Sequence, residues 1–306
     1  MDDGEMKTMG LLTRWKTEHR AQIDEYSFII HTLVRNPLSA VGLLIVLGIV
    51  VTAIASLVLG PLAAWETSSL GQKLLPPSLE HLFGTDDMGR DILRRVLSGT
   101  RISIEIGTVV VAIGIGIGVP LGLAAGFLGG KTDEIIMRTT DMFLSFPPLL
   151  LALFIAAALG PSITNAMAAI SITWWPWYTR LVRSQTLSLK EEAFVEAARS
   201  LGASNARIVF RHILPNCWAP AMVQASMDVG YAILTAAALG FIGVGAQPPT
   251  PEWGLMVSQG RIYLPVYWWA STFPGLAILV AVLGFNLLGD ALRDLFDPRI
   301  RRQYWT

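Results

Sequence analysis

Long apolar stretches separated by short polar segments dominate this chain. A helix needs about 20 mostly apolar residues to cross a membrane, and six segments reach this length. The predicted spans run approximately over Leu38–Leu59, Ser103–Phe127, Ile135–Leu159, Ser162–Val182, Ala219–Val244 and Ser271–Gly289. The pattern therefore predicts an all-α, polytopic membrane protein with six transmembrane helices.

The composition supports a membrane protein and excludes several other classes. Apolar side chains make up 53% of the 306 residues and charged ones 15%, against about 25% charged in an ordinary soluble domain. Lys plus Arg and Asp plus Glu both number 23, so there is no basic excess to hold nucleic acid. One cysteine, Cys217, excludes an internal disulfide and a cysteine-based zinc site. We expect neither a nucleic-acid partner nor a bound metal.

The distribution of basic residues predicts that both termini are cytoplasmic. Lys and Arg accumulate in cytoplasmic loops, and they are frequent in both tails and between the fourth and fifth spans. The first loop is an exception, because it would place Lys73, Arg90, Arg94, Arg95 and Arg101 outside. We expect the structure or a partner to accommodate these charges.

The predicted organisation has three parts. Residues 1–36 form a cytoplasmic N-terminal segment, residues 37–292 the membrane domain, and residues 293–306 a cytoplasmic tail. Within the first part, the apolar stretch Tyr26–Val34 predicts either a helix on the membrane surface or an extension of the first span.

Four glycines in the second predicted span form a stripe. Gly114, Gly118, Gly122 and Gly126 recur every four residues, which places them on one helix face. Small residues let membrane helices approach closely. The stripe predicts a tightly packed neighbour, which could belong to this chain or to another.

Aromatic residues gather in two places. Trp174, Trp175, Trp177 and Tyr178 lie towards the end of the fourth predicted span, and Tyr263–Trp269 precedes the sixth. Trp and Tyr are enriched where a membrane meets water. We predict interfacial belts in preference to ligand-stacking sites.

One charge lies well inside a predicted span. Asp228 is about nine residues into the fifth, and charges at such positions mark functional sites by default. Asp228 could face a water-filled path and attract a cationic group such as an amino terminus. The alternative is a hydrogen-bonded or partner-facing carboxylate near the inner leaflet.

The segment between the fourth and fifth predicted spans reads as two short helices around a turn. Gly202 suits the left-handed conformation that ends a helix, Ser204 could cap the next one, and Pro215 is expected to end it. One helix face carries Ala193, Phe194, Ala197, Ala198 and Leu201. The segment predicts a docking element for another protein; the alternative is amphipathic helices that pack on their own bundle.

Four segments carry a family resemblance. Glu196-Ala197-Ala198, Gly202 and Leu214-Pro215, at this spacing, resemble the EAA loop of ABC-importer permeases. The segments His81–Asp91, Gly240–Gly254 and Asn286–Arg299 are similar to those of the dipeptide, oligopeptide and nickel branch, in which the sequence around His212 is also usual. The resemblance extends from about Asn36 onward and is strongest to the second, C-type permease of a dipeptide importer.

The resemblance implies the type I ABC-importer permease fold in the bacterial inner membrane, surrounded by lipid. It implies that the chain is not an enzyme and binds no cofactor. Two partner ABC ATPase subunits would bind ATP and Mg, a second homologous permease would complete the path, and a periplasmic or extracellular substrate-binding protein would deliver the solute.

The resemblance also implies roles for individual residues. The coupling loop, about residues 190–216, would fit a cleft on an ATPase subunit. Glu196 would stabilise or orient this loop, Ala197 and Ala198 would lie close to the ATPase, and Gly202 would allow the tight turn, while Leu214 and Pro215 complete the motif. Contacts with the binding protein would come from Asp86, Asp87, Arg90, Asp91, Gln247, Glu252 and Trp253.

Two other signals are interpreted as structural. Asp86, Asp87 and Asp91 lack the spacing of an EF-hand, so we predict helix capping and turns around Gly84 and Gly89. Residues 125–132 approach a phosphate-binding loop but close a membrane span instead of linking a strand to a helix. A turn is predicted there.

The function implied by the resemblance is ATP-driven import of dipeptides or short peptides. Nickel, glutathione or another solute is the alternative within the same machinery. An ion-coupled secondary transporter is the alternative from another class. It would need buried charges or broken helices at the midplane, and Asp228 is the candidate.

Overall fold

The computed structural model describes residues 36–58 and 70–296, so the stretch Tyr26–Val34 and the end of the C-terminal tail lie outside the described residues. Within these ranges the fold is helical, and extended pairing is limited to one bridge between Thr85 and Asp91. The elements are α4 (Pro37–Val58), η1 (Leu70–Gln72), α5 (Ile92–Leu128), α6 (Gly130–Leu144), α7 (Pro148–Leu159), α8 (Ile163–Leu189), α9 (Ala193–Ser200), α10 (Asn205–Ile208), the π-helical turn η2 (Val209–Ile213), α11 (Leu214–Ile242), α12 (Trp253–Gly260), η3 (Arg261–Tyr263) and α13 (Trp269–Phe296).

The described helices that could cross a membrane number four or five. Length and apolar composition select α4, α5, α13 and the continuous helix Asn205–Ile242. The pair α6 and α7, bent by 85°, makes a fifth if the two helices are counted as one span. The predicted third span is therefore a broken helix, because Pro147 and Pro148 interrupt backbone hydrogen bonding.

The predicted fourth span forms α8. At 27 residues it is about 40 Å long, but its polar residues leave it outside the set that composition selects. The all-α membrane fold is confirmed, whereas the number of six spans is not confirmed in the part of the chain described.

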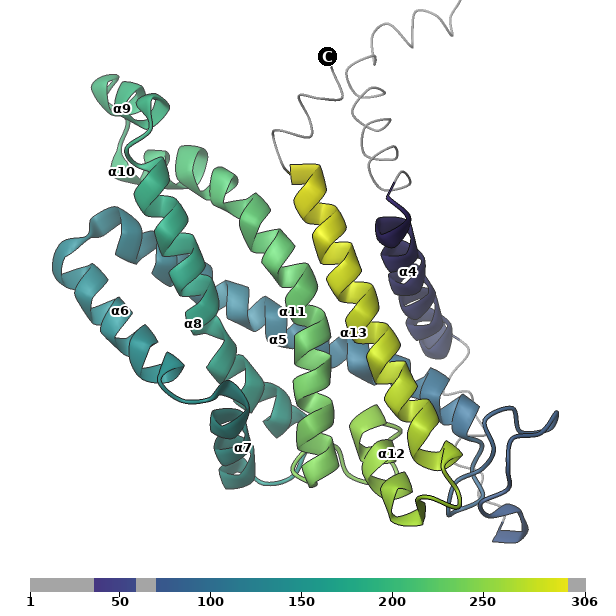
Figure 1. The fold of residues 1–306 in the computed structure, drawn as a ribbon. Helices are drawn as coiled ribbons and strands as arrows, with labels where there is room; N and C mark the ends of the chain where they lie inside the picture. Colours follow the sequence, from purple (N-terminus) through teal and green to yellow (C-terminus); the bar gives the residue numbers. More distant parts are fainter. Residues whose placement is uncertain (1–35, 59–69, 297–306) are drawn as a thin grey trace, which may run out of the picture.

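The helices are arranged so that functional segments gather at two ends (Figure 1). The long helix α5 crosses behind α8, α11 and α13, with α4 beside α13 and the α6–α7 pair beside α8. At one end lie α9, α10, the start of α4 and the end of α13. At the other end lie α12 and the segment before α5.

The neighbour of the glycine stripe is α8 of the same chain. A Cβ built on Gly118 would lie 2.5 Å from the Cβ of Tyr178. One on Gly122 would lie 2.7 Å from the carbonyl oxygen of Thr179, and one on Gly126 2.6 Å from the Cβ of Thr186. The two backbones thus pack too closely for any side chain between them.

This close packing overturns the interfacial-belt prediction for the first aromatic cluster. Tyr178 is fully buried and Trp175 is 8% exposed, while Trp177 is 48% exposed. Tyr178 packs over Gly114 and Gly118. Its ring fills the space that the glycines leave, and most of the cluster belongs to the protein core.

Ion pairs attach α6 to α8. Arg183 donates to both carboxylate oxygens of Asp133, at 2.5 and 2.6 Å, and Arg180 pairs with Asp141 at 2.5 Å. The Asp133 pair is the more enclosed, with side chains 21% and 29% exposed. These contacts orient the first half of the broken span, because bidentate Arg–carboxylate bonds fix geometry.

We predict that Gly118→Ala destabilises the protein. The new Cβ would collide with Tyr178 and with the Trp175 carbonyl oxygen, 2.5 and 2.6 Å away, and overpacking costs about 1–3 kcal/mol. The solubilised protein is heated, and the fraction that stays monodisperse is measured by size-exclusion chromatography. The temperature at which half of the protein is lost should be lower for this variant than for the unmodified protein. Gly116→Ala is the matched control, because nothing lies within 4 Å of that position. Equal midpoints for the two variants would contradict this account of the stripe.

Candidate functional site

The α9–α10 turn has the local geometry that the sequence predicts. Gly202 adopts φ = +78°, which is in the left-handed region that side chains disfavour. Its N–H donates to the Arg199 carbonyl, and the next N–H donates to that of Ala198, closing α9. Ser204 accepts a hydrogen bond from the Arg207 N–H and caps α10. The glycine and the cap are both confirmed as structural features.

The apolar face of α9 is exposed rather than packed on the bundle. Leu201 is 89% and Phe194 42% exposed, and Ala197 and Glu196 are also exposed. The opposite face holds α9 in place through Val195, which is fully buried with Ile208 and Ile213 in a cluster that includes residues of α5 and α8. The arrangement favours a docking element over helices that cover their own bundle.

Pro215 begins a helix, which corrects the prediction that it ends one. It lies in the first turn of α11. Proline cannot donate an N–H and its ring crowds the preceding turn. The wider π-helical turn η2 precedes it, where the Leu214 N–H donates to the Val209 carbonyl five residues earlier. The chain therefore continues as one helix from Asn205 to Ile242.

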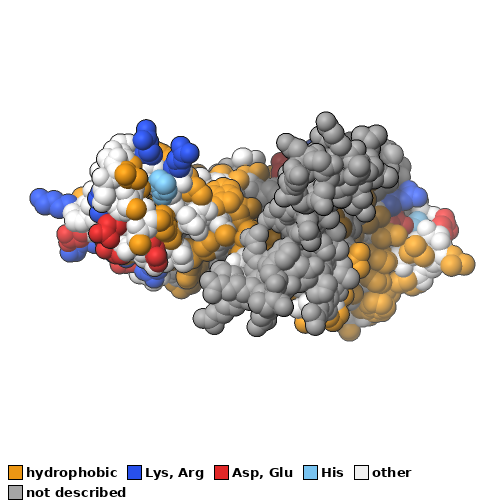
Figure 2. Space-filling model, turned by 90° about the horizontal axis from the view of Figure 1, so that it is seen from above, with side chains coloured by type: hydrophobic (Ala, Val, Ile, Leu, Met, Phe, Trp, Pro, Cys, Tyr) orange, Lys and Arg blue, Asp and Glu red, His pale blue; other side chains and the backbone are white. Residues whose placement is uncertain are grey.

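This end of the molecule presents mixed chemistry at its surface. Figure 2 looks onto it and shows Lys, Arg and His side chains beside hydrophobic ones. The Phe194 and His212 rings lie 6.4 Å apart and link α9 to η2. Within the described residues Glu196 forms no ion pair, so its carboxylate is available to a partner.

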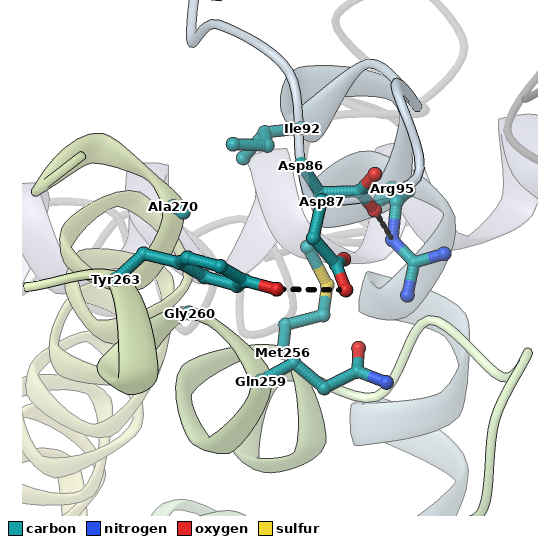
Figure 3. Close-up of a pocket in the computed structure, with 9 residues that line it drawn as sticks. All are labelled: Asp86, Asp87, Ile92, Arg95, Met256, Gln259, Gly260, Tyr263 and Ala270. Carbon is teal, nitrogen blue, oxygen red and sulfur yellow. Dashed lines mark hydrogen bonds and ion pairs between the residues drawn. The ribbon is translucent and has the colours of Figure 1, made fainter. Parts of the chain in front are cut away.

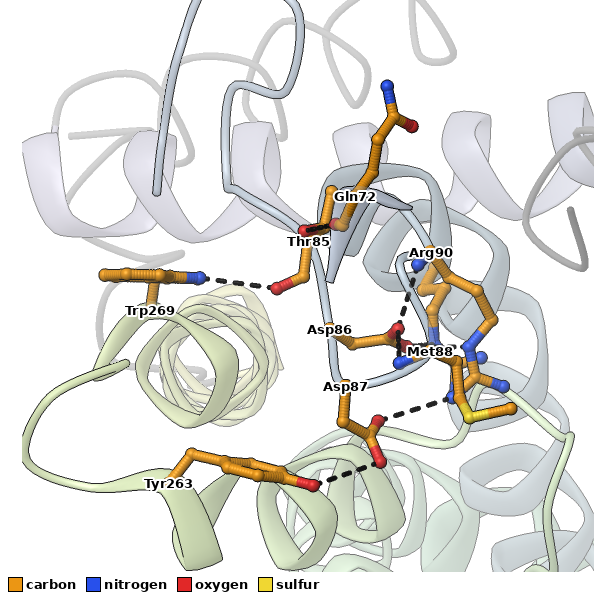
Figure 4. Close-up of polar contacts among 9 residues, drawn as sticks. Gln72, Thr85, Asp86, Asp87, Met88, Arg90, Tyr263 and Trp269 are labelled. Carbon is orange, nitrogen blue, oxygen red and sulfur yellow. Dashed lines mark hydrogen bonds and ion pairs between the residues drawn. The ribbon is translucent and has the colours of Figure 1, made fainter. Parts of the chain in front are cut away.

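Asp86 organises the segment before α5 at the other end (Figure 4). Its carboxylate accepts hydrogen bonds from the N–H groups of Met88 and Arg90 and from Arg90 Nε at 2.7 Å. Arg95 Nε lies 3.5 Å from Asp86 Oδ2, the oxygen that also pairs with Arg90. The side chains of Arg90 and Arg95 are 8% and 1% exposed. Two of the five basic residues that were expected outside the membrane therefore pair with a carboxylate inside the chain, which accounts for part of the exceptional charge of this loop.

Asp91 is a helix cap, as predicted. It accepts a hydrogen bond from the Arg94 N–H at 2.9 Å and pairs with His81 Nδ1 at 2.9 Å. Gly84 and Gly89 have φ of +74° and +75°. Asp86 and Asp91 therefore serve turn formation and capping, whereas Asp87 contacts Arg90 and Tyr263 instead.

The α11–α13 connection packs against this segment. Tyr263 donates a hydrogen bond to Asp87 at 3.4 Å, and Trp269 Nε1 donates to the Thr85 carbonyl at 3.3 Å. The negative charge of Asp87 raises the pKa of Tyr263. The cavity between the two segments, shown in Figure 3, measures about 10 Å³, which is room for about one water molecule. Residues of both segments line this cavity, and it is too small to hold a solute.

Glu252 and Trp253 are buried, which places their side chains away from the surface. Glu252 is 3% exposed and caps α12 through the N–H groups of Gly254 and Leu255. Burial raises the pKa of Glu252, and these two hydrogen bonds act in the opposite direction. Trp253 is 2% exposed and donates to the Val96 carbonyl at 2.9 Å. Gln247 is exposed.

Asp228 lies inside the bundle, in α11. Its side chain is 4% exposed and accepts a hydrogen bond from Gln224 at 2.9 Å. The polar groups of Tyr178 and Trp174, both on α8, lie beside the same carboxylate. This environment matches the hydrogen-bonded alternative for Asp228.

Comparison with known proteins identifies the family. Residues 118–302, more than half of the chain, match the family described as "Binding-protein-dependent transport system inner membrane component". The chain belongs to this family. It is therefore a permease subunit of an ABC importer and a multi-pass membrane protein.

Curated relatives cover most of this permease. A dipeptide transport system permease protein of Alkalihalophilus pseudofirmus is 47% identical over 88% of both chains. A probable D,D-dipeptide transport system permease protein of Escherichia coli is 53% identical over 75% of this chain and 77% of its own. A glutathione transport system permease protein of Pectobacterium atrosepticum is 46% identical over 74% and 75%.

A solved structure supports the permease fold. The permease is similar to a chain of the MetNI methionine ABC transporter in an inward-facing conformation, with a TM-score of 0.54 and 20% identity. The match covers 67% of this chain and 98% of the other. At this identity the similarity concerns the fold, and it confirms the predicted ABC-importer permease architecture.

We predict that Asp86→Asn strongly destabilises the permease. It removes the carboxylate that faces two buried guanidinium groups, and breaking a buried pair costs about 3–5 kcal/mol. The low end is expected, because Asp87 remains 4.0 Å from Arg90. Glu134→Gln is the control, since its pair with Arg138 has side chains 58% and 77% exposed and should cost well under about 1 kcal/mol. Similar melting midpoints for the two variants would contradict the proposed role of Asp86.

Proposed function

We propose that this permease takes part in ATP-driven import of dipeptides or other short peptides. The observation that carries the proposal is the exposed apolar face of α9, held by buried Val195 and closed by Gly202. A docking surface at the end of the bundle fits a transporter whose energy comes from separate ATPase subunits. The peptide assignment rests on relatives with 47% and 53% identity that carry dipeptide names.

In this proposal residues 190–216 form the coupling loop. Leu201 and Phe194 insert into an ATPase cleft, and Ala197 and Ala198 allow close approach because their side chains are small. Glu196 remains available for an ionic contact with the ATPase, while Gly202 sets the turn. Leu214 and Pro215 begin α11, so movement of the loop reaches a membrane helix directly. ATP and Mg bind the two ATPases, and the permease itself is not catalytic.

The orientation follows from the same assignment. The α9 end faces the cytoplasm together with the N-terminal segment (1–36) and the tail (293–306), and the membrane domain spans residues 37–292. The opposite end then faces the periplasm or the cell exterior. Its exposed groups, including Gln247 and the partly exposed Asp87, contact a substrate-binding protein. Asp86, Arg90, Asp91, Glu252 and Trp253 hold that surface in shape.

A second permease completes the path, and Asp228 supports that path from inside the bundle, through its hydrogen bond to Gln224, rather than by facing the solute. Glutathione is the alternative solute favoured by a specific observation, the relative of that name at 46% identity. Nickel is a further alternative. An ion-coupled secondary transporter is disfavoured because the chain belongs to a binding-protein-dependent transport family, although the bend between α6 and α7 and the buried Asp228 are features that such a transporter would use.

The function is tested by reconstitution, with Gly202 as the informative position. The permease, purified with its partner permease and ATPases and supplied with the binding protein, should take up radiolabelled dipeptide with ATP. Gly202→Val should reduce uptake at least about tenfold, because a β-branched residue is an outlier at φ = +78°. Gly202→Asn is the control and should retain most uptake, since Asn tolerates this conformation.

Absence of dipeptide uptake by the unmodified complex would refute the peptide assignment. Equal uptake by the Gly202→Val and Gly202→Asn complexes would refute the role of the turn.

We predict the sidedness of the two ends from cysteine labelling. Native Cys217 is 1% exposed, so it contributes little background. An impermeant maleimide should label Leu79→Cys, whose native side chain is 99% exposed, only from the outside. It should label Lys131→Cys only in inverted vesicles.

Docking is tested with the same reagent. In inverted vesicles, Leu201→Cys should react only after the ATPase subunits are stripped, because Leu201 is 89% exposed in this chain alone. Lys131→Cys is the control, and should react whether or not the ATPases are present. Reaction of Leu201→Cys from the outside would contradict the orientation, and reaction unaffected by the ATPases would contradict the docking surface.

A further inference from the structure

A larger cavity lies between α8, α11 and α13. Its volume is about 470 Å³, within the range of about 300–1,000 Å³ that is usual for small-molecule sites. Apolar walls come from Leu181, Val223, Met227 and Phe296, and polar groups come from Gln224 and Arg293. The lining is mainly apolar with a few polar groups, which is typical of binding sites for small organic solutes.

One wall of this cavity is backed by a negative charge. Gln224 Nε2 donates to Asp228 Oδ1 at 2.9 Å. This bond uses one of the two N–H groups of the amide, and the amide oxygen of Gln224 is free to accept a hydrogen bond from a ligand. Asp228 is 4% exposed, so water screens the interaction of its carboxylate with neighbouring groups only weakly.

Another wall supplies a positive charge. Arg293, in the last turn of α13, also lines the cavity. Its guanidinium can bind a carboxylate with two parallel hydrogen bonds. The cavity thus offers an acceptor backed by a negative charge and a cationic donor, separated by apolar surface.

We propose that this cavity is a subsite for a short peptide with both termini free. Arg293 binds the carboxylate, the Gln224 amide oxygen binds the ammonium group with the charge of Asp228 behind it, and the apolar walls contact the side chains. This inference rests on the proposed peptide function and adds Gln224 and Arg293 as residues that recognise the peptide termini.

An anionic lipid is the competing occupant, and the charges disfavour it. A phosphate group and an acyl chain would use Arg293 and the apolar walls, but the carboxylate of Asp228 behind Gln224 would disfavour a phosphate at the opposite wall. Arg293 also lies where the helix dipole favours a cation. Loss of stability in an Arg293 variant is therefore no test of ligand binding.

The test measures protection of a cysteine in the cavity. Val223→Cys is the reporter, in inverted vesicles that contain the whole transporter, and import by right-side-out vesicles verifies that this variant functions. Dialanine at about twice its dissociation constant should slow maleimide labelling about threefold by occupancy. Dialanine amide and N-acetyldialanine should protect much less, since each lacks one charged terminus.

Arg293 is tested on the same reporter. Arg293→Gln should reduce protection by dialanine to the level seen with dialanine amide. Lys131→Gln removes an exposed cation elsewhere and should leave protection unchanged. Trp218→Cys, on α11 but outside the cavity lining, should be labelled at the same rate with or without peptide.

Three outcomes separate this inference from the proposed function. Unprotected Val223→Cys in membranes that import dialanine would overturn the subsite and leave peptide import standing. Protection that follows the anionic lipid content and ignores dialanine would assign the cavity to lipid and also overturn the proposal. Failure of the unmodified transporter to import dialanine would instead contradict the proposed function.

Discussion

The close contact of α5 with α8 is the constraint on which the other elements depend. Lipid tails are as apolar as Leu, so helices in a membrane gain little from hydrophobic burial and associate through close packing. The stripe from Gly114 to Gly126 brings the two backbones together, and Tyr178 fills the space beside it. α8 in turn holds α6 through Arg183 and Asp133. The α5–α8 pair also contributes to the cluster that buries Ile208 and Ile213, so it supports the root of the docking element as well.

Charged side chains are buried and paired at one end of the bundle and exposed at the other. At the end before α5, Asp86 gathers buried guanidinium groups, and Asp87 and Thr85 are tied to η3 and α13 by Tyr263 and Trp269. Buried charges need partners, and at this end Asp86 and Asp87 supply them to Arg90 and Arg95 while also linking the segment before α5 to η3. At the α9 end the charged and apolar side chains are exposed around a turn. Among the described residues, the apolar face of α9 has no cover, which is the condition expected of a surface completed by another protein.

Sequence reasoning succeeded where the information is local and failed where it depends on a neighbour. Apolar runs located the helices, because the cost of crossing lipid adds along the chain. Gly202, Ser204 and Asp91 were predictable since a cap involves only nearby backbone groups. The burial of Trp175, Glu252 and Trp253 was not, because residues distant in sequence cover them. Pro215 was misread because a π-helical turn absorbs its missing N–H, and the bend at Pro147-Pro148 was overlooked within an otherwise apolar run.

The continuity of the helix from Asn205 to Ile242 connects the docking element with the interior of the membrane domain. Under the proposed function, a displacement of α9 acts on the beginning of this helix. There Ile208 and Ile213 pack with Val195 of α9 in one buried cluster. Gln224 lies ten residues after Leu214, about 15 Å along the same helix. The π-helical turn Val209–Ile213 lies just before this stretch, between α10 and α11, and such turns frequently occur at functional sites. One continuous helix therefore reaches from the coupling loop to the proposed peptide subsite, and rotation or translation of α11 would move Gln224 and Asp228 relative to Arg293 on α13. The position of α9 would then control peptide binding and release directly through this helix, with no further element needed to transmit the movement.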